Sequence, residues 1–342
     1  MSPPRAGGPP GGGTPALLIT IDTEGDNLWA RPKNVTTRNA LFLPRFQALC
    51  ERHGCKPVYL TNYEMVRCLE FVEFARDAIR RGRAEVGMHL HAWNSPPAYA
   101  LTPDDGFHQP FLPEYPDHVL EAKVRFLTEL LADTFDAPVV SHRAGRWSFD
   151  HRYARALIAN GYLADCSVTP RVSWCETLGD PAGGGGADYS RFPDTPYFID
   201  PEDIGRPGAS PLLEVPMTIL SLEPGPVRAI REQLPHSSLP ARALRRFLPP
   251  VAWLRPDGTN RSAMLRILDR ARREAYPCAE FMLHSSELMP GGSPSFPTER
   301  SIELLYEDLE AIFSAAARSF IGATLAEFRR RWPDAPDRGS GD

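Results

Sequence analysis

Short apolar segments with high β-propensity alternate with amphipathic helical segments along most of this chain of 342 residues. The first of them, residues 16–21, is an unbroken apolar run, which is typical of a strand covered on both faces in a parallel sheet or a barrel. About seven strand–helix units follow one another, and that number favours a barrel over an open sheet. The alternation therefore predicts an α/β fold, a β/α barrel of about seven strands.

The predicted elements occupy one domain over residues 16–332, without an internal repeat or a second domain. Predicted strands lie at 16–21, 56–60, 85–90, 138–141, 163–168, 212–219, 279–283 and 319–321, and predicted helices at 44–53, 63–81, 119–135, 150–160, 261–274, 301–314 and 324–332. Residues 1–15 are rich in glycine and proline, so we expect them to be disordered. Residues 220–260 form an irregular insertion, and we expect the polar tail at 333–342 to be loose.

The composition is that of a soluble globular protein, with 42% hydrophobic and 24% charged residues. The net charge of −5 argues against a nucleic-acid-binding protein, whose binding domain is normally basic. No run of about 18 apolar residues is present, so we expect no transmembrane segment. The N-terminal segment lacks the apolar core of a signal peptide, and the six cysteines show no C-x-x-C spacing. These features predict a cytoplasmic protein with reduced thiols, and none of them indicates an oligomeric state.

The segment Glu85-Val-Gly-Met-His-Leu-His-Ala-Trp93 has the pattern of a buried strand that ends in two histidines. Residues i and i+2 of a strand point to the same side, so His89 and His91 can present both imidazoles to one point. Two converging imidazoles suit a divalent ion such as zinc. Taken alone, an H-x-H pair is more often a packing or hydrogen-bonding pair than a metal site.

Further polar residues stand at the ends of predicted strands, where a β/α barrel gathers its catalytic groups. Asp22 and Glu24 follow the first strand, Arg143 follows the fourth, Asp165 lies near the end of the fifth, and His284 follows a late strand. Each has an ordinary explanation, because acids after strands commonly cap turns and arginines commonly form ion pairs. Their joint placement indicates an active site at one rim of the barrel.

Glu24, His89 and His91 form a candidate metal site. They supply one oxygen and two nitrogens, the ligand set of many catalytic zinc sites. Hydrolysis at such a site also needs an open coordination position for water. The sequence therefore predicts a divalent metal cofactor, with Zn²⁺ as the first choice.

Four other residues are candidates for the proton transfers that hydrolysis requires. Asp22 is the candidate general base, and Arg143 is the residue expected to orient it. His284 is the candidate general acid, held protonated by a carboxylate such as that of Asp165.

Candidate substrate-binding residues are adjacent to these groups. Trp93, Arg146, Trp147 and Ser285 each stand within four residues of a candidate catalytic or metal-binding residue. Packing in the core is the ordinary alternative for the two tryptophans. The arginine-rich stretch 240–273 has two interpretations: a solvated insertion whose arginines cover apolar surface, or a patch for an anionic substrate or a membrane surface.

Five short motifs, in order along residues 16–332, resemble those of the polysaccharide deacetylase family with its NodB-homology domain. They are Ile21-Asp-Thr-Glu-Gly25, Glu85-Val-Gly-Met-His-Leu-His91, His142-Arg-Ala-Gly-Arg-Trp147, Asp165-Cys-Ser-Val-Thr-Pro170 and Leu283-His-Ser-Ser286. The resemblance implies a distorted (β/α) barrel and a hydrolase that uses a divalent metal, usually zinc, to remove N- or O-linked acetyl groups from sugars. The roles that it implies are base for Asp22, partner of the base for Arg143, acid for His284, partner of the acid for Asp165, and metal ligands for Glu24 and His89.

The motifs also depart from the family pattern. Trp93 occupies the position four residues after His89, where the second histidine usually stands, so His91 would have to replace it. Glu24 stands where aspartate is more common in the first motif, and the third motif lacks its usual prolines. This pattern resembles a variant branch of the family.

From the sequence we expect a metal-dependent hydrolase that removes acetyl groups from a sugar or a polysaccharide precursor. Two alternatives stay open: a metal-dependent hydrolase of another non-peptide amide on the same barrel, and a non-catalytic carbohydrate-binding relative. The complete set of Asp22, Arg143 and His284 argues against the second alternative. The sequence indicates neither the sugar nor whether the acetyl group is N- or O-linked.

Overall fold

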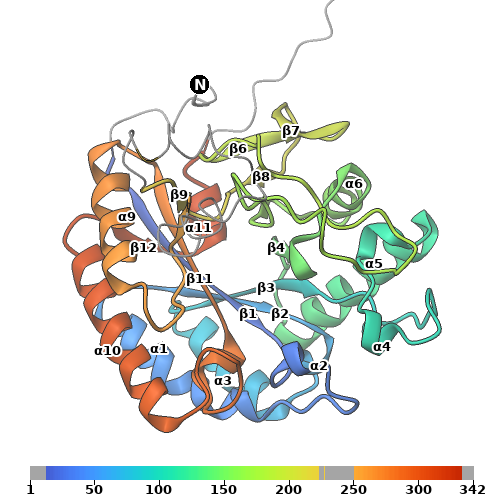
Figure 1. Cartoon of the computed structure of the whole chain (residues 1–342), viewed down its shortest axis with the longest axis horizontal. Coiled ribbons are helices and arrows are strands. Elements are labelled where there is room, and N and C mark those ends of the chain that lie inside the picture. Colours follow the sequence, from blue (N-terminus) through green and yellow to red (C-terminus); the bar gives the residue numbers. More distant parts are fainter. Residues whose placement is uncertain (1–12, 223–226, 228–249, 333–342) are drawn as a thin grey trace, which may run out of the picture.

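The computed structural model describes residues 13–222, 227 and 250–332. Predictions that lie outside the described residues are those for 1–12, for 333–342, and for 223–226 and 228–249 of the insertion. The described chain forms a curled, mostly parallel sheet with helices around it (Figure 1).

Seven parallel strands form the main part of the sheet in the described residues. In spatial order they are β11 (Cys278–His284), β1 (Ala16–Thr23), β2 (Pro57–Thr61), β3 (Glu85–Leu90), β4 (Ser141–Ala144), β5 (Ala164–Asp165) and β8 (Leu213–Glu214). The other strands are antiparallel or short: β6 (Tyr197–Asp200) and β7 (Asp203–Pro207) extend the sheet beyond β8, β12 (Ile321–Ala323) pairs with the start of β1, and β9 (Ile219–Leu220) pairs with β10 (Ala252–Trp253). The parallel order and strand number confirm the predicted barrel class. The described part of the barrel is open, because β11 and β7 form its two edges.

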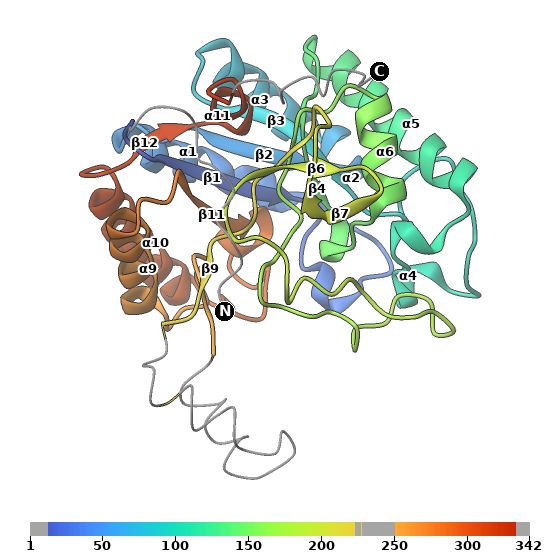
Figure 2. The same cartoon turned by 90° about the horizontal axis from the view of Figure 1, so that it is seen from above.

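Amphipathic helices cover the sheet. The longer ones are α1 (Leu43–Arg52), α3 (Leu69–Arg80), α5 (Asp117–Phe135), α6 (His151–Ala159), α9 (Arg261–Arg273) and α10 (Glu299–Ala316), and the shorter ones are α2 (Tyr63–Val66), α4 (Asp105–His108) and α11 (Leu325–Arg329). Figure 2 shows α9 and α10 on the β11 side of the molecule, with α5 and α6 on the β4 side. The apolar stripe of α5 is buried, including Leu120, Val124 and Leu131. Among the described residues, no helix has both the length and the hydrophobicity that a bilayer crossing needs.

Several predicted limits differ from the observed ones. The strand expected at 138–141 is β4, three residues later, so His142 and Arg143 lie within the strand rather than after it. The strand expected at 163–168 is reduced to the two residues of β5, and the one expected at 212–219 is divided between β8 and β9. Pairing with neighbouring strands decides these limits, and an apolar run contains no information about the neighbours. The same holds for the β6–β7 hairpin, which was not predicted.

The register of the parallel strands brings the candidate residues to one edge of the sheet. Asp22 at the end of β1 is paired with His284 at the end of β11. His89 near the end of β3 is paired with Arg143 of β4. Glu24 follows β1 directly, so all five residues lie on neighbouring strand ends.

Candidate active site

A cavity of about 250 Å³ lies at the C-terminal ends of these strands. The side chains that line it include Asp22, Glu24, His89, His91 and His284. The structure therefore brings together the five candidate residues that come from three separate stretches of the sequence.

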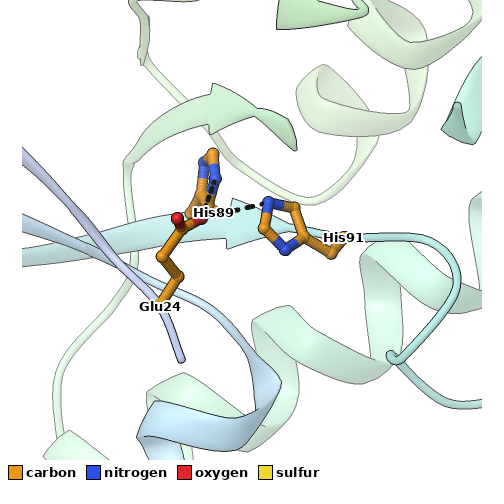
Figure 3. Close-up of side chains that lie close together, drawn as sticks. All are labelled: Glu24, His89 and His91. Carbon is orange, nitrogen blue, oxygen red and sulfur yellow. Dashed lines mark ion pairs between the residues drawn. The ribbon is translucent and has the colours of Figure 1, made fainter. Parts of the chain in front are cut away.

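Glu24, His89 and His91 form a compact buried cluster in this cavity (Figure 3). The ligand atoms of the three side chains all lie within 4.8 Å of one another. Glu24 Oε2 is 3.3 Å from His91 Nε2 and 3.6 Å from His89 Nε2. Two ligands of one tetrahedral zinc ion, each about 2.1 Å from it, lie about 3.4 Å apart. The observed spacing therefore fits a single zinc-sized cation.

A backbone hydrogen bond fixes how His89 faces this cluster. His89 Nδ1 lies 3.0 Å from the carbonyl oxygen of Arg143, and a carbonyl can only accept, so Nδ1 carries the proton of this hydrogen bond. The second nitrogen, Nε2, then faces Glu24 and is the nitrogen available to a cation. Although burial opposes it, Asp22 raises the pKa of His89, which favours a proton on Nε2 until a cation displaces it.

His91 is held by packing rather than by hydrogen bonds. Its ring stacks on Trp93, with centroids 4.4 Å apart and an interplanar angle of 17°. Gly145, directly after β4, makes room for this ring, because a Cβ there would stand 2.5 Å from His91 Cδ2 and 2.4 Å from the carbonyl oxygen of Leu90. Burial and the neighbouring His89 lower the pKa of His91 well below its usual value, which leaves a neutral ring with a lone pair for a cation.

Arg143 holds Asp22 in its charged form. Its Nη1 donates to Asp22 Oδ1 at 2.6 Å, and the guanidinium is completely buried. The same side chain donates to Thr20 and Glu280 through Nη2 and to the carbonyl of Cys166 through Nε. Although burial disfavours the carboxylate, Arg143 holds the pKa of Asp22 well below its usual range.

The second oxygen of Asp22 faces the cluster. Oδ2 lies 3.8 Å from His89 Nε2 and 3.7 Å from His284 Nε2. His284 Nε2 is also 3.9 Å from Glu24 Oε1. One carboxylate oxygen and one imidazole nitrogen therefore border the cluster of metal-binding side chains.

This chain is similar to known proteins in its fold rather than in its sequence. No protein-family model matches the sequence, and no curated protein matches it. Solved structures do match, and the ones described below have low sequence identity to this chain. A provisionally assigned glycoside hydrolase/deacetylase from Parabacteroides distasonis has a TM-score of 0.57 at 11% identity, over 93% of this chain and 71% of that one. A provisionally assigned polysaccharide deacetylase from Mycobacterium smegmatis has a TM-score of 0.52 at 14% identity, over 96% and 94% of the two chains.

The chain has the fold of the polysaccharide deacetylases. A 4-α-glucanotransferase from Thermococcus litoralis also matches, with a TM-score of 0.51 and 12% identity, and this chain spans 40% of its length. One fold can support different reactions, so the deacetylase fold by itself does not decide the chemistry. The side chains of the site must do so.

Asp165 is not placed in this deacetylase fold as the sequence predicted. Its carboxylate lies 2.5 Å from His142 Nδ1 and accepts a hydrogen bond from Ser167. Asp165 pairs with His142 because β5 is the neighbour of β4 in the sheet. The carboxylate beside Nδ1 of His284 is instead that of Glu287, whose Oε2 lies 3.3 Å from this nitrogen.

Three of the four predicted substrate-binding residues line the cavity, namely Trp93, Arg146 and Trp147. Arg146 and Trp147 both have positive φ angles, 54° and 59°, which residues other than glycine rarely adopt. Ser285 is completely buried, and its hydroxyl bonds to the main-chain N–H and C=O of Glu24. Ser285 therefore positions the backbone of Glu24, and its contact with a substrate stays a prediction.

The deacetylase fold adds residues to the cavity wall that the sequence analysis did not select. They include Trp29, Gln109, Trp174, Thr177 and Arg255. Trp29 packs edge-on against the ring of His284, with centroids 4.8 Å apart. Its position a few residues after the acidic motif is the one signal that could have indicated it. Trp174 and Arg255 come from distant loops, and nothing in their local sequence indicates the contact.

Proposed function

We propose that this protein is a metal-dependent hydrolase that removes acetyl groups, N- or O-linked, from a sugar or a polysaccharide precursor. The observation that carries the proposal is the convergence on one cavity of Glu24, His89 and His91 with the ionised Asp22 and with His284. Glycoside chemistry uses a pair of carboxylates and has no need for two buried imidazoles beside them.

Glu24, His89 and His91 would hold the cation, which when bound supplies a Lewis acid for the attacking water and the acetyl carbonyl. Asp22 then accepts the proton of the water through Oδ2, while Arg143 keeps the other oxygen occupied. The hydroxyl adds to the acetyl carbon, the bond from that carbon to the sugar nitrogen or oxygen breaks, and acetate leaves. His284 gives the proton from Nε2 to the departing sugar atom.

The lining of the cavity supports a sugar as the substrate. Four of the six tryptophans of the chain line it: Trp29, Trp93, Trp147 and Trp174. Flat aromatic faces with a few polar groups between them suit the alternating C–H faces and hydroxyls of a sugar ring. Polar side chains among them include Gln109, Arg146, Thr177 and Arg255.

A substrate panel tests this proposal against the two alternatives. Zinc-loaded protein is incubated with N-acetylated and O-acetylated oligosaccharides and with small cyclic amides, and acetate and free amine are measured. Release of acetate from the sugars supports the proposal. Turnover of the cyclic amides without acetate release would replace it with the other amide hydrolase, and sugar binding without any turnover would identify a non-catalytic relative.

We expect His89→Ala to lose the cation and the activity together. The wild-type protein should contain about one zinc ion per chain, and the variant should contain little. Acetate release should fall by more than about 100-fold, because both the nitrogen ligand and its orientation by the Arg143 carbonyl are lost. Elemental analysis and an acetate assay measure the two effects.

The matched control is His118→Ala, at an exposed position of α5. It should keep both the zinc content and the rate. Full activity of His89→Ala, or of wild-type protein freed of metal by a chelator, would contradict the proposed metal site.

A further inference from the structure

We propose that Glu287, held in place by Arg255, is the positioning residue of His284. This is the role, partner of the general acid, that the sequence predicted for Asp165. This inference rests on the proposed function. It concerns which nitrogen of His284 carries the exchangeable proton.

The carboxylate of Glu287 contacts both the main chain and the side chain of His284. His284 caps the 3₁₀ turn Ser285–Leu288, and Glu287 is the third residue of that turn. Glu287 Oε2 accepts the backbone N–H of His284 at 2.8 Å and lies 3.3 Å from the ring nitrogen Nδ1. The Glu287 side chain is only 2% exposed, so water does not compete for these contacts.

Arg255 fixes the other oxygen of the same carboxylate. Its Nη2 lies 3.2 Å from Glu287 Oε1 and 3.2 Å from His284 Nδ1. A guanidinium is always a donor, so it cannot accept a proton from the ring. A proton on Nδ1 is therefore donated to Glu287, while Arg255 donates to Oε1. In the competing arrangement the ring proton is on Nε2, and the lone pair of Nδ1 accepts a hydrogen bond from Arg255.

The contacts of the carboxylate favour the first arrangement. Arg255 opposes the effect of burial and lowers the pKa of Glu287 to about 2, so an anion stands beside Nδ1. An Nδ1–H held by Glu287 leaves Nε2 as the nitrogen that binds and releases a proton. That nitrogen faces Asp22 Oδ2 at 3.7 Å, and Trp29 packs against the ring from the cavity side. Carboxylates orient the imidazoles of hydrolytic triads in the same way.

The test compares Glu287→Gln with the wild-type protein, both loaded with zinc, on two substrates. With an N-acetylated sugar, whose amine must be protonated to leave, we expect kcat to fall by about 100-fold and KM to change by less than about threefold. With an activated aryl acetate, whose leaving group needs no proton, we expect kcat to fall by less than about threefold. A merely structural role of Glu287 would lower both rates alike, and that result would overturn the proposal.

Nitrogen-15 NMR of histidine-labelled protein gives a readout that does not depend on turnover. In the wild-type protein we expect the signal of His284 to show a protonated Nδ1, and in Glu287→Gln a shift of the population towards protonated Nε2. An unchanged tautomer would contradict the proposal. If the wild-type protein releases no acetate from any sugar, the proposed function fails, and this spectrum still decides the positioning role. If Glu287→Gln does not fold, the spectrum of the wild-type protein decides, because a neutral His284 with its proton on Nε2 would contradict the proposal.

Glu327→Gln is the matched control. Glu327 is also the third residue of a capped turn, accepts the backbone N–H of Thr324 at 3.1 Å and pairs with Lys56, but it belongs to α11 and not to the cavity wall. Its kcat on both substrates and the spectrum of His284 should equal those of the wild-type protein.

Discussion

Asp22→Asn is expected to lower kcat for deacetylation by about 10²–10⁴-fold. An amide cannot accept a proton from water, whereas the carboxylate of Asp22 is ionised and turns Oδ2 towards the metal-binding cluster. The substitution preserves the size of the side chain, and Arg143 keeps its contact with Glu280. Zinc content and the circular dichroism spectrum should therefore stay at wild-type values, while acetate release is nearly lost.

Asp77→Asn is the control for this prediction. Asp77 lies on the surface of α3 and pairs with Arg80 and Arg81. Its rate should not change. An Asp22→Asn protein with more than about a tenth of the wild-type kcat would remove Asp22 from the role of base.

Arg143→Met is expected to reduce the free energy of unfolding by about 3–5 kcal/mol. Arg143 is fully buried between two carboxylates, Asp22 and Glu280. Removing its charge leaves both acids in the interior without a cation, which is far more costly than the loss of an exposed ion pair. Urea unfolding followed by circular dichroism measures the difference.

Two further variants make this prediction specific. Arg45→Met removes an arginine that forms two hydrogen bonds to Glu303 on the surface, where solvent screens the pair, and it should be much less destabilising. Adding Glu280→Gln to Arg143→Met removes one of the two unpaired acids, so part of the lost stability should return. If Arg143→Met were as stable as Arg45→Met, the buried network would not contribute as described.

The part of the site that lies on strands could be predicted from the sequence. A strand has a period of two residues, which places His89 and His91 on the same side, and parallel strands end at the same edge, which brings Asp22 next to His284. The fold class followed from the same alternation of strands and helices. These inferences need only local patterns and one rule about parallel sheets.

The partners of the catalytic groups could not be predicted in this way. Asp165 stands near the end of a strand like the other candidates, but its strand lies beside β4, so it meets His142. The carboxylate that lies beside Nδ1 of His284, that of Glu287, is positioned by a 3₁₀ turn, and Arg255 comes from within the insertion 220–260. Such contacts depend on which strands are neighbours in the sheet and on the course of the loops. Local sequence patterns specify neither of these.

The pairing of Asp22 with His284 across β1 and β11 makes the acid–base spacing independent of the segments that contact the substrate. Neighbouring strands lie about 4.8 Å apart, so the hydrogen bonds of the sheet set the distance between proton acceptor and proton donor. Trp29, Trp93 and Trp174 stand outside the strands of the sheet, on connecting segments. Loop exchange or loop insertion can therefore alter which molecule is accepted while the acid–base spacing stays constant, which makes this barrel a suitable scaffold for redirecting specificity.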